Sequence, residues 1–199
     1  MAEIPLFPIP MVLFPGGTLP LQIFEVRYLD MVKRCMRQGA GFGVVLIEEG
    51  HQLLRDMDQQ LPTVSHCGTY CTIVDFDQQP NGMLGITAEG QAKFVIRDQY
   101  EGDNRLMMAD VEFLDSETDG GVPEQHEHLI NLLDTLLKHN SFKERQLVID
   151  YGQAREVGAR LTEILPCPNE MKQRLLEMKD PVARLGELEK VIANLQIST

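Results

Sequence analysis

A chain of 199 residues that is 43% hydrophobic is long enough for one sizeable domain, or for a medium domain with a smaller second part. The formal net charge of −12 makes a nucleic-acid backbone or an anionic membrane surface an unfavourable partner on average. A chain of this length does not need its four cysteines as a disulfide framework, so we expect reduced thiols in a cytoplasmic protein.

Residues 4–32 are strongly apolar, yet five prolines interrupt them: Pro5, Pro8, Pro10, Pro15 and Pro20. Closely spaced prolines prevent a continuous helix, so neither a signal peptide nor a membrane-spanning helix fits this run. Glu3 also stands where a signal peptide carries basic residues. Proline is accepted at strand ends, edges and bulges. The run therefore predicts short, bent strands joined by turns, as at the start of a small barrel or coiled sheet.

One helix and several strands are predicted next. Apolar residues recur at near-helical spacing from Glu25 to Arg37, and Gly39 is a natural stop. Asn81-Gly82 is a strong signal for a two-residue hairpin turn. The runs that favour strands are 41–49, 69–78, 84–100 and 106–115. The first part of the chain is therefore expected to be mostly antiparallel sheet with one inserted helix.

The periodicity changes after residues 116–123, whose composition is typical of a linker. Leucines recur at helical spacing over 129–137, and a second helical pattern covers 157–165. A short helix is expected near 169–178, and Asp180-Pro181 is a strong start for a last one. The chain is thus predicted to be α+β, with a β-rich domain at 1–118 and a C-terminal helical bundle at 119–199.

A metal site is weakly suggested by His66, Cys67 and Cys71. Structural zinc sites use four ligands, usually as two close pairs, and no second pair accompanies this one. We therefore expect Cys67 and Cys71 to be small buried apolar residues on or beside a strand, and we expect neither a metal nor a cofactor.

The glycines Gly85 and Gly90 have the spacing of a phosphate-binding loop, but Gln91 and Ala92 follow instead of lysine and a hydroxyl residue. A β-turn with glycines at positive φ is the favoured interpretation.

Two further pairs of residues have side chains of the kinds that bind metals or transfer protons. Asp75 and Asp77 share one face of a strand and are interpreted as a solvated strand end. The spacing of His126 and His128 predicts that they point to different sides of a helix.

A polar group stands where strand gives way to helix: Glu25 and Arg27, beside Phe24 and Tyr28. These residues could face a ligand groove. The favoured interpretation is structural, with the group capping the helix and tying the junction to the sheet.

The opening IPLFPIPMVLFPGGTLPLQIFEVRYLDMV resembles the start of the substrate-binding, N-terminal domain of Lon proteases. Later segments resemble the family in the same order, including 43–46, 64–69 and 84–94, and the segment 159–188 resembles the helical tail of stand-alone bacterial relatives. Two departures are present. His66 and Cys67 stand inserted before the glycine of the family's turn, and Lys93 occupies the place of its usual basic residue.

The resemblance implies a twisted, PUA-like antiparallel pseudo-barrel followed by a helical bundle. Lon proteases continue with an ATPase module and a Ser-Lys protease module. This sequence contains no G-x-x-x-x-G-K-[ST] motif, and no serine–lysine pair can be assigned in it. We therefore expect neither ATPase nor peptidase activity.

The leading hypothesis, implied by the resemblance, is a non-catalytic module that binds unfolded or degron-bearing polypeptides or a protein partner, as an adaptor or a chaperone-like binder. Two kinds of binding surface are considered. One is an apolar surface, and the other is an exposed strand edge that takes an added peptide strand. The candidate binding residues are Phe14, Leu21, Phe24, Glu25, Arg27 and Tyr28.

Two alternatives of other classes stay open. PUA-like barrels often bind RNA, although the net charge of −12 disfavours this. An enzyme with an undetected pocket would use residues such as Glu25, His66 or Asp75. The sequence leaves the partner and the oligomeric state open.

Overall fold

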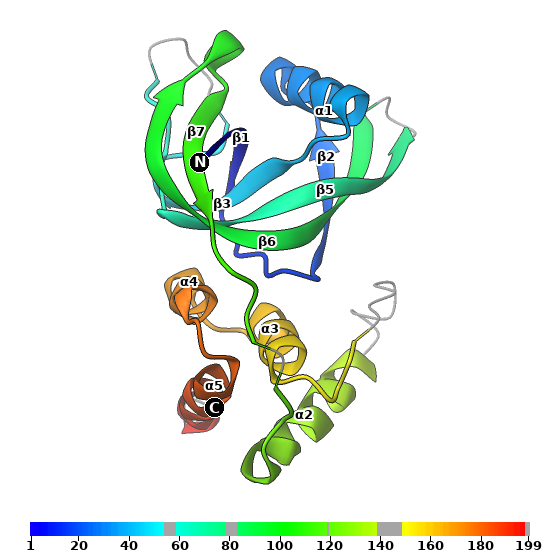
Figure 1. Cartoon of the computed structure of the whole chain (residues 1–199), viewed down its shortest axis with the longest axis vertical. Helices are drawn as coiled ribbons and strands as arrows, with labels where there is room; N and C mark the ends of the chain where they lie inside the picture. The colour runs from blue at the N-terminus through cyan, green and yellow to red at the C-terminus, as the bar shows by residue number, and fades with distance from the viewer. Residues whose placement is uncertain (54–58, 79–82, 119, 139–148, 198–199) are drawn as a thin grey trace. The chain divides into compact units, whose positions relative to one another are not determined.

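The chain forms two compact units, Met1–Asp115 and Ser116–Thr199, in a computed structural model. The structure describes residues 1–53, 59–78, 83–118, 120–138 and 149–197. The first unit contains the sheet and the second contains helices α2 to α5 (Figure 1). The architecture is α+β, with a mostly antiparallel sheet.

The sheet has seven strands and is followed along its pairings in the order β1-β7-β6-β5-β3-β4, with β2 paired to β6. β1 also pairs with β3 in parallel, so the pairing path returns to its first strand. The other pairings are antiparallel. The strands are β1 Ala2–Ile9, β2 Thr18–Ile23, β3 Phe42–Glu49, β4 Thr63–Val64, β5 Cys67–Gln78, β6 Leu84–Glu101 and β7 Met107–Phe113.

The proline-rich opening is extended chain, as predicted. β1 changes partner along its length, because residues 2–5 pair with β7 and residues 6–9 pair with β3. Its inward side chains belong to the core, and Leu6 is fully buried. Gly16 has φ 74° in the connection to β2, where its N–H donates to the carbonyl of Gly90 at 2.8 Å.

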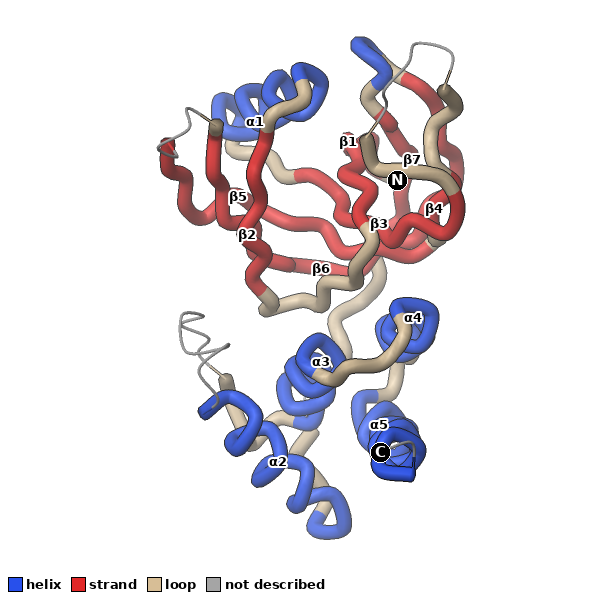
Figure 2. The backbone as a smooth tube through the Cα atoms, turned by 180° about the vertical axis from the view of Figure 1, so that it is seen from behind, coloured by secondary structure: helices blue, strands red, loops and turns tan. Residues whose placement is uncertain are grey.

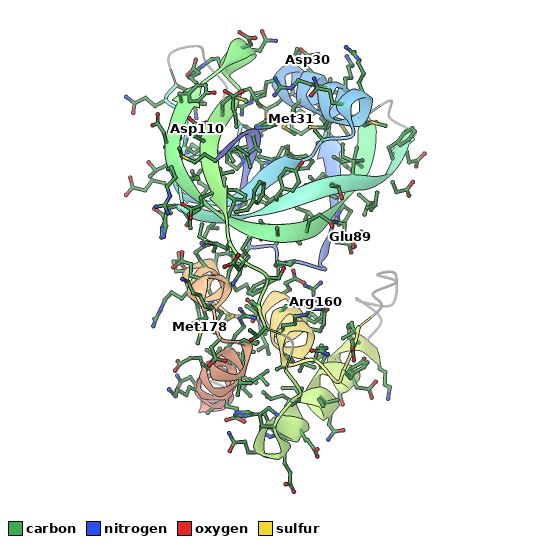
Figure 3. The ribbon with its side chains drawn as sticks, viewed as in Figure 1. Asp30, Met31, Glu89, Asp110, Arg160 and Met178 are labelled. Carbon is green, nitrogen blue, oxygen red and sulfur yellow. The ribbon has the colours of Figure 1, made fainter. Side chains whose placement is uncertain are left out.

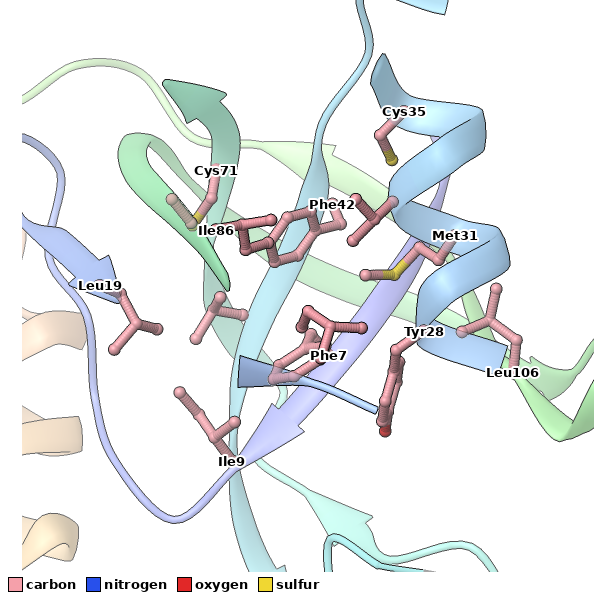
Figure 4. Packing of buried hydrophobic residues seen from close by; sticks show 14 of the residues in the cluster. Phe7, Ile9, Leu19, Tyr28, Met31, Cys35, Phe42, Cys71, Ile86 and Leu106 are labelled. Carbon is pink, nitrogen blue, oxygen red and sulfur yellow. The ribbon is translucent and has the colours of Figure 1, made fainter. Parts of the chain in front are cut away.

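The inserted helix, α1 (Val26–Gln38), ends where the sequence predicts, since Gly39 has the left-handed φ of 63° that favours glycine. Its inner side joins the main core cluster, in which Met31 packs among strand residues that include Phe7 and Phe42 (Figure 4). Asp30 lies on the outer side of the helix and Met31 on the inner side (Figure 3).

The predicted turn at Gly85 and Gly90 is wrong, because both residues lie inside the long strand β6 and neither has positive φ. Gly90 has a packing reason instead: a Cβ there would overlap the carbonyl oxygen of Phe14. The predicted hairpin turn at Asn81-Gly82 lies outside the described residues. The strands on either side of it pair antiparallel, with Gln78 opposite Leu84.

The second unit is helical and also contains a short 3₁₀ turn, η2 (Glu124–His126). α3 packs against α2, α4 and α5 (Figure 2). Asp180 caps α5, since its Oδ1 accepts the N–H groups of Val182 and Ala183 at 2.8 and 3.2 Å. The helices are α2 Glu127–Lys138, α3 Ala154–Ile164, α4 Asn169–Glu177 and α5 Pro181–Ile197.

Candidate functional site

The six residues predicted to bind a partner differ in exposure. Phe14 and Tyr28 are core residues, 1% and 4% exposed, so their side chains are not on a surface of this structure. Arg27 is also buried, and Leu21 and Glu25 are half-buried. Only Phe24 is well exposed, at 53%. The structure therefore does not bring the six together as one exposed patch.

Arg27 holds the strand-to-helix junction together. Its Nε donates to Glu25 Oε2 at 3.1 Å, its Nη2 to the carbonyl of Gln52 at 2.8 Å and its Nη1 to the carbonyl of Arg105 at 3.2 Å. The guanidinium also lies 4.5 Å from the centre of the Tyr28 ring. These contacts tie the junction to two other segments of the first unit, in line with a structural role. The predicted cap is wrong, because the side chain of Glu25, at the N-cap position of α1, accepts no hydrogen bond from the N–H groups of the helix start.

A groove of about 400 Å³ lies over the end of the sheet where β2, β6 and β5 run side by side. Each strand contributes three consecutive residues, at 20–22, 85–87 and 75–77. The pairing register sets which side chains share a face. Leu21, Ile86 and Phe76 lie on the core face, and their neighbours in each strand lie on the outer face.

At this groove the outer face of the sheet is acidic, and one position on that face has no side chain. Gly85 lies between Gln22 on one neighbouring strand and Asp77 on the other, and it contributes no side chain. Asp75 and Asp77 are exposed on the same face, as the sequence predicts. Neither carboxylate forms an ion pair with the lysines and arginines that the structure describes.

Apolar side chains are exposed around the same end of the sheet. Phe76 is 60% exposed although it shares a face with the buried Ile86, because β5 extends here beyond the core. Val74 is the extra residue of a β-bulge and is also exposed. Phe24 and Val26 are exposed just after β2. All exposed large apolar side chains among the described residues belong to the first unit.

A second groove, of about 430 Å³, lies between β1, the end of α1 and β7. Its wall is fixed by Tyr70, whose Oη accepts the N–H of Gly41 at 2.6 Å and whose ring meets Phe113 edge-on at 5.3 Å. Cys35 also lines it. Burial raises the pKa of the Cys35 thiol, and the thiol donates to the carbonyl of Gly41 at 3.3 Å, so it is not activated as a nucleophile.

The remaining sequence candidates do not converge on a catalytic centre. Cys67 and Cys71 are buried, which confirms the prediction that they are small buried residues of a strand. His66 is exposed, unlike the two cysteines. Within the described residues, no group of three histidine, cysteine or acidic side chains is placed to hold a metal ion.

The prediction for His126 and His128 is wrong. Nδ1 of His126 and Nε2 of His128 both approach Glu189 Oε1 on α5, at 2.6 and 3.3 Å. They meet the same carboxylate because His126 belongs to the tighter 3₁₀ turn η2 and only His128 to α2. The contact joins three elements of the second unit, η2, α2 and α5.

Sequence reasoning missed Val74, Phe76 and the groove, because these depend on the register between three strands that are distant in the chain. The available signal was Phe76 between Asp75 and Asp77: an aromatic on the face opposite two acids, near the end of a predicted strand.

Comparison with known proteins identifies the family. Residues 3–194 match the family model described as the ATP-dependent protease La (LON) substrate-binding domain. The chain belongs to this family of substrate-binding domains. No helix among the described residues has both the length and the hydrophobicity needed to cross a bilayer.

Two solved structures are similar over nearly their whole length. The first is a Lon N-terminal domain protein from Xanthomonas campestris, 32% identical, with a TM-score of 0.76 over 96% of this chain and 98% of that chain. The second is the N-terminal domain of the Lon protease of the Mycobacterium avium complex. It is 15% identical, with a TM-score of 0.56 over 94% of this chain and 96% of that one, and it supports the fold alone.

Proposed function

We propose that this protein is a non-catalytic module that binds polypeptide segments, as an adaptor or a chaperone-like binder, through the end of the sheet formed by β2, β6 and β5. Membership of a substrate-binding domain family is the observation that carries the proposal. The closed path of strand pairings supports a PUA-like pseudo-barrel as its scaffold, with the helices α2 to α5 forming a C-terminal bundle.

The surface around the groove has the properties that such binding needs. An unfolded segment exposes apolar side chains, and covering one aromatic side chain completely is worth about 1.5–3 kcal/mol. Phe76, Val74 and Phe24 offer such contacts at or near the groove, whose lining also includes the carboxylates of Asp75 and Asp77. The acidic face would repel acidic segments and favour neutral or basic ones.

The proposal is tested by binding of a permanently unfolded, fluorescently labelled polypeptide to the parent protein and to Phe76→Ser. Loss of the aromatic should weaken binding about tenfold. Met36→Ser is the matched control, since Met36 is similarly apolar and exposed but lies on α1, outside the groove. Equal binding by the parent and Phe76→Ser, or no binding by either, would overturn the proposal.

The adaptor and chaperone-like roles differ in stoichiometry. A chaperone-like binder should bind several unrelated unfolded polypeptides with comparable affinity, whereas an adaptor should bind one folded partner at a fixed ratio. RNA is a competing ligand in the same assay. Tight, salt-sensitive RNA binding that displaces the polypeptide would replace the proposed function with the RNA-binding one.

A further inference from the structure

The outer edge of β5 is unpaired over residues 74–78 in the described part of the chain. β3 pairs with β5 only from Thr69 to Cys71, and β6 occupies the other side of β5. The same end of the sheet has a second outer edge along β2, which among the described strands pairs with β6 alone. Unpaired edges can accept an added strand, so the backbone groups that point outward decide what each edge can bind.

The direction of these groups follows from Gly90. Its carbonyl accepts the N–H of Gly16 at 2.8 Å, and its own N–H donates to the carbonyl of Gly17 at 2.9 Å, so its backbone groups face the β2 side. Successive residues of a strand direct their backbone groups to opposite sides. In β6, the even-numbered residues from 84 to 88 therefore face β2, and the odd-numbered residues from 85 to 89 face β5.

The β2 edge lacks its central donor. Leu19 and Leu21 are opposite the even-numbered Ala88 and Ile86, so their backbone groups face β6, and those of Pro20 face outward. Proline has no N–H to offer an incoming strand, which is a common protection of an edge. An added strand would therefore miss a hydrogen bond at the centre of β2.

The β5 edge keeps its central donor, but the donor is already occupied. Asp75 and Asp77 are opposite the odd-numbered Thr87 and Gly85, so their backbone groups face β6 and those of Phe76 face outward. The N–H of Phe76 donates to Oδ1 of Asp75 at 2.9 Å. A carboxylate that accepts an edge N–H competes with the carbonyl of an incoming strand.

We infer that the edge around Phe76 accepts an extended polypeptide segment in which an apolar residue stands between two lysines or arginines, and that Asp75 acts as a latch on this edge. The inference rests on the proposed function and names its substrate class. The two cations would lie opposite Asp75 and Asp77 on the outer face, and the apolar residue would lie opposite Phe76 on the other face. Exposure of all three side chains leaves room for these partners.

The latch couples recognition of charge to pairing of the backbone. A cation opposite Asp75 draws the carboxylate away from the N–H of Phe76, and the freed N–H then donates to the carbonyl of the incoming segment. A neutral segment must displace the carboxylate without this compensation, so it binds more weakly. Neither of these two carboxylates forms an ion pair with a lysine or arginine that the structure describes, so both are available to the cations of an incoming segment.

Three labelled seven-residue peptides test the inference, each with a central valine flanked by two lysines, two glutamines or two glutamates. The parent protein at low salt should bind the lysine peptide about tenfold more tightly than the glutamine peptide, and the glutamate peptide least. Methylation of the valine nitrogen removes the N–H that would donate to the carbonyl of Phe76. It should weaken binding of the lysine peptide about tenfold.

The variants Asp75→Ala and Asp77→Ala form a matched pair, because both remove one negative charge from the same face of the same strand. Both should weaken binding of the lysine peptide relative to the glutamine peptide. Only Asp75→Ala should bind the glutamine peptide more tightly, by about threefold or more, because it alone frees the N–H of Phe76. Asp75→Asn retains an acceptor for that N–H and should leave the affinity for the glutamine peptide unchanged.

Equal effects of Asp75→Ala and Asp77→Ala on the glutamine peptide would overturn the latch. Equal binding of the methylated and unmethylated lysine peptides would overturn strand addition. Either result could occur while unfolded polypeptide still binds in a Phe76-dependent way, and the proposed function would then survive without this inference. Circular dichroism of each variant shows whether the sheet is retained, and the peptide methylation test requires no substitution in the protein.

Discussion

Arg27 Nε donates to Glu25 Oε2 at 3.1 Å, across the start of α1. The remaining guanidinium donors leave the helix and reach the carbonyls of Gln52 and Arg105, which are 25 and 78 residues away in the chain. One buried side chain therefore joins three segments of the first unit. Removal of a buried cation with three acceptors is costly in stability, because it leaves those acceptors without their donor.

Replacement of this side chain should destabilise the first unit. We expect Arg27→Ala to lower the free energy of unfolding by about 3 kcal/mol, measured by urea denaturation. Arg27→Lys keeps the charge but cannot match the geometry of the three acceptors. Its free energy of unfolding should therefore lie between that of the parent and that of Arg27→Ala. The control is Arg97→Ala, which removes an exposed ion pair with Glu112 and should cost less than about 1 kcal/mol. Similar losses for Arg27→Ala and Arg97→Ala would contradict the assigned role.

Tyr28 should make stability fall at alkaline pH. Burial is the main cause that raises the pKa of its phenol above the ordinary value of 10.0, so the folded state keeps a proton that the unfolded state releases. The contribution is complete below about pH 10 and is lost as pH rises above it. Urea denaturation between pH 8 and 11 should show a steeper decline for the parent than for Tyr28→Phe. Parallel curves would show that the ionisation of Tyr28 does not matter.

Thiol reactivity should separate the four cysteines. Cys35, Cys67 and Cys71 are buried, whereas Cys167 is half-buried with a pKa raised by burial, the largest effect on it. A disulfide reagent should label Cys167 first and slowly in the native protein, and all four thiols once the protein is unfolded in denaturant. Cys167→Ser should remove the first phase alone. Rapid labelling of two or more thiols in the native protein would contradict the described packing.

Gly90 should not tolerate a side chain. A Cβ would overlap the backbone carbonyl of Phe14, and backbone yields less readily than a flexible side chain. We expect Gly90→Ala to lower the free energy of unfolding by about 2–3 kcal/mol. Gly186→Ala, in α5, is the contrasting variant. It meets nothing within 4 Å and should be neutral or add up to about 1 kcal/mol. A thermal or urea transition unchanged in Gly90→Ala would refute the steric argument.

Local patterns explain what the sequence predicted well. The helix at 26–38 has apolar residues at helical spacing and a glycine at its left-handed end, so its limits depend on neighbouring residues only. The cap at Asp180 is local in the same way. The prolines of the first two strands also act through their own backbone, by excluding a helix.

The errors concern features that distant residues determine. Gly90 is required by the approach of Phe14 and not by a turn, and the burial of Tyr28 depends on strands that its own helix does not reveal. His126 meets Glu189, which lies 63 residues later in the sequence. The groove arises from the register of three strands. None of these relationships is encoded in the spacing of nearby residues.

The first strand places a constraint on synthesis. Ala2 is opposite Val111, so the opening strand finds one of its two neighbours only after the last strand of the unit has left the ribosome. Its other partner, β3, is available much earlier. Until β7 has been synthesised, the nascent chain carries an apolar strand with one unpaired side, a state that is prone to aggregation. A gene truncated before residue 107 should therefore yield insoluble product, whereas one that ends shortly after residue 115 should not.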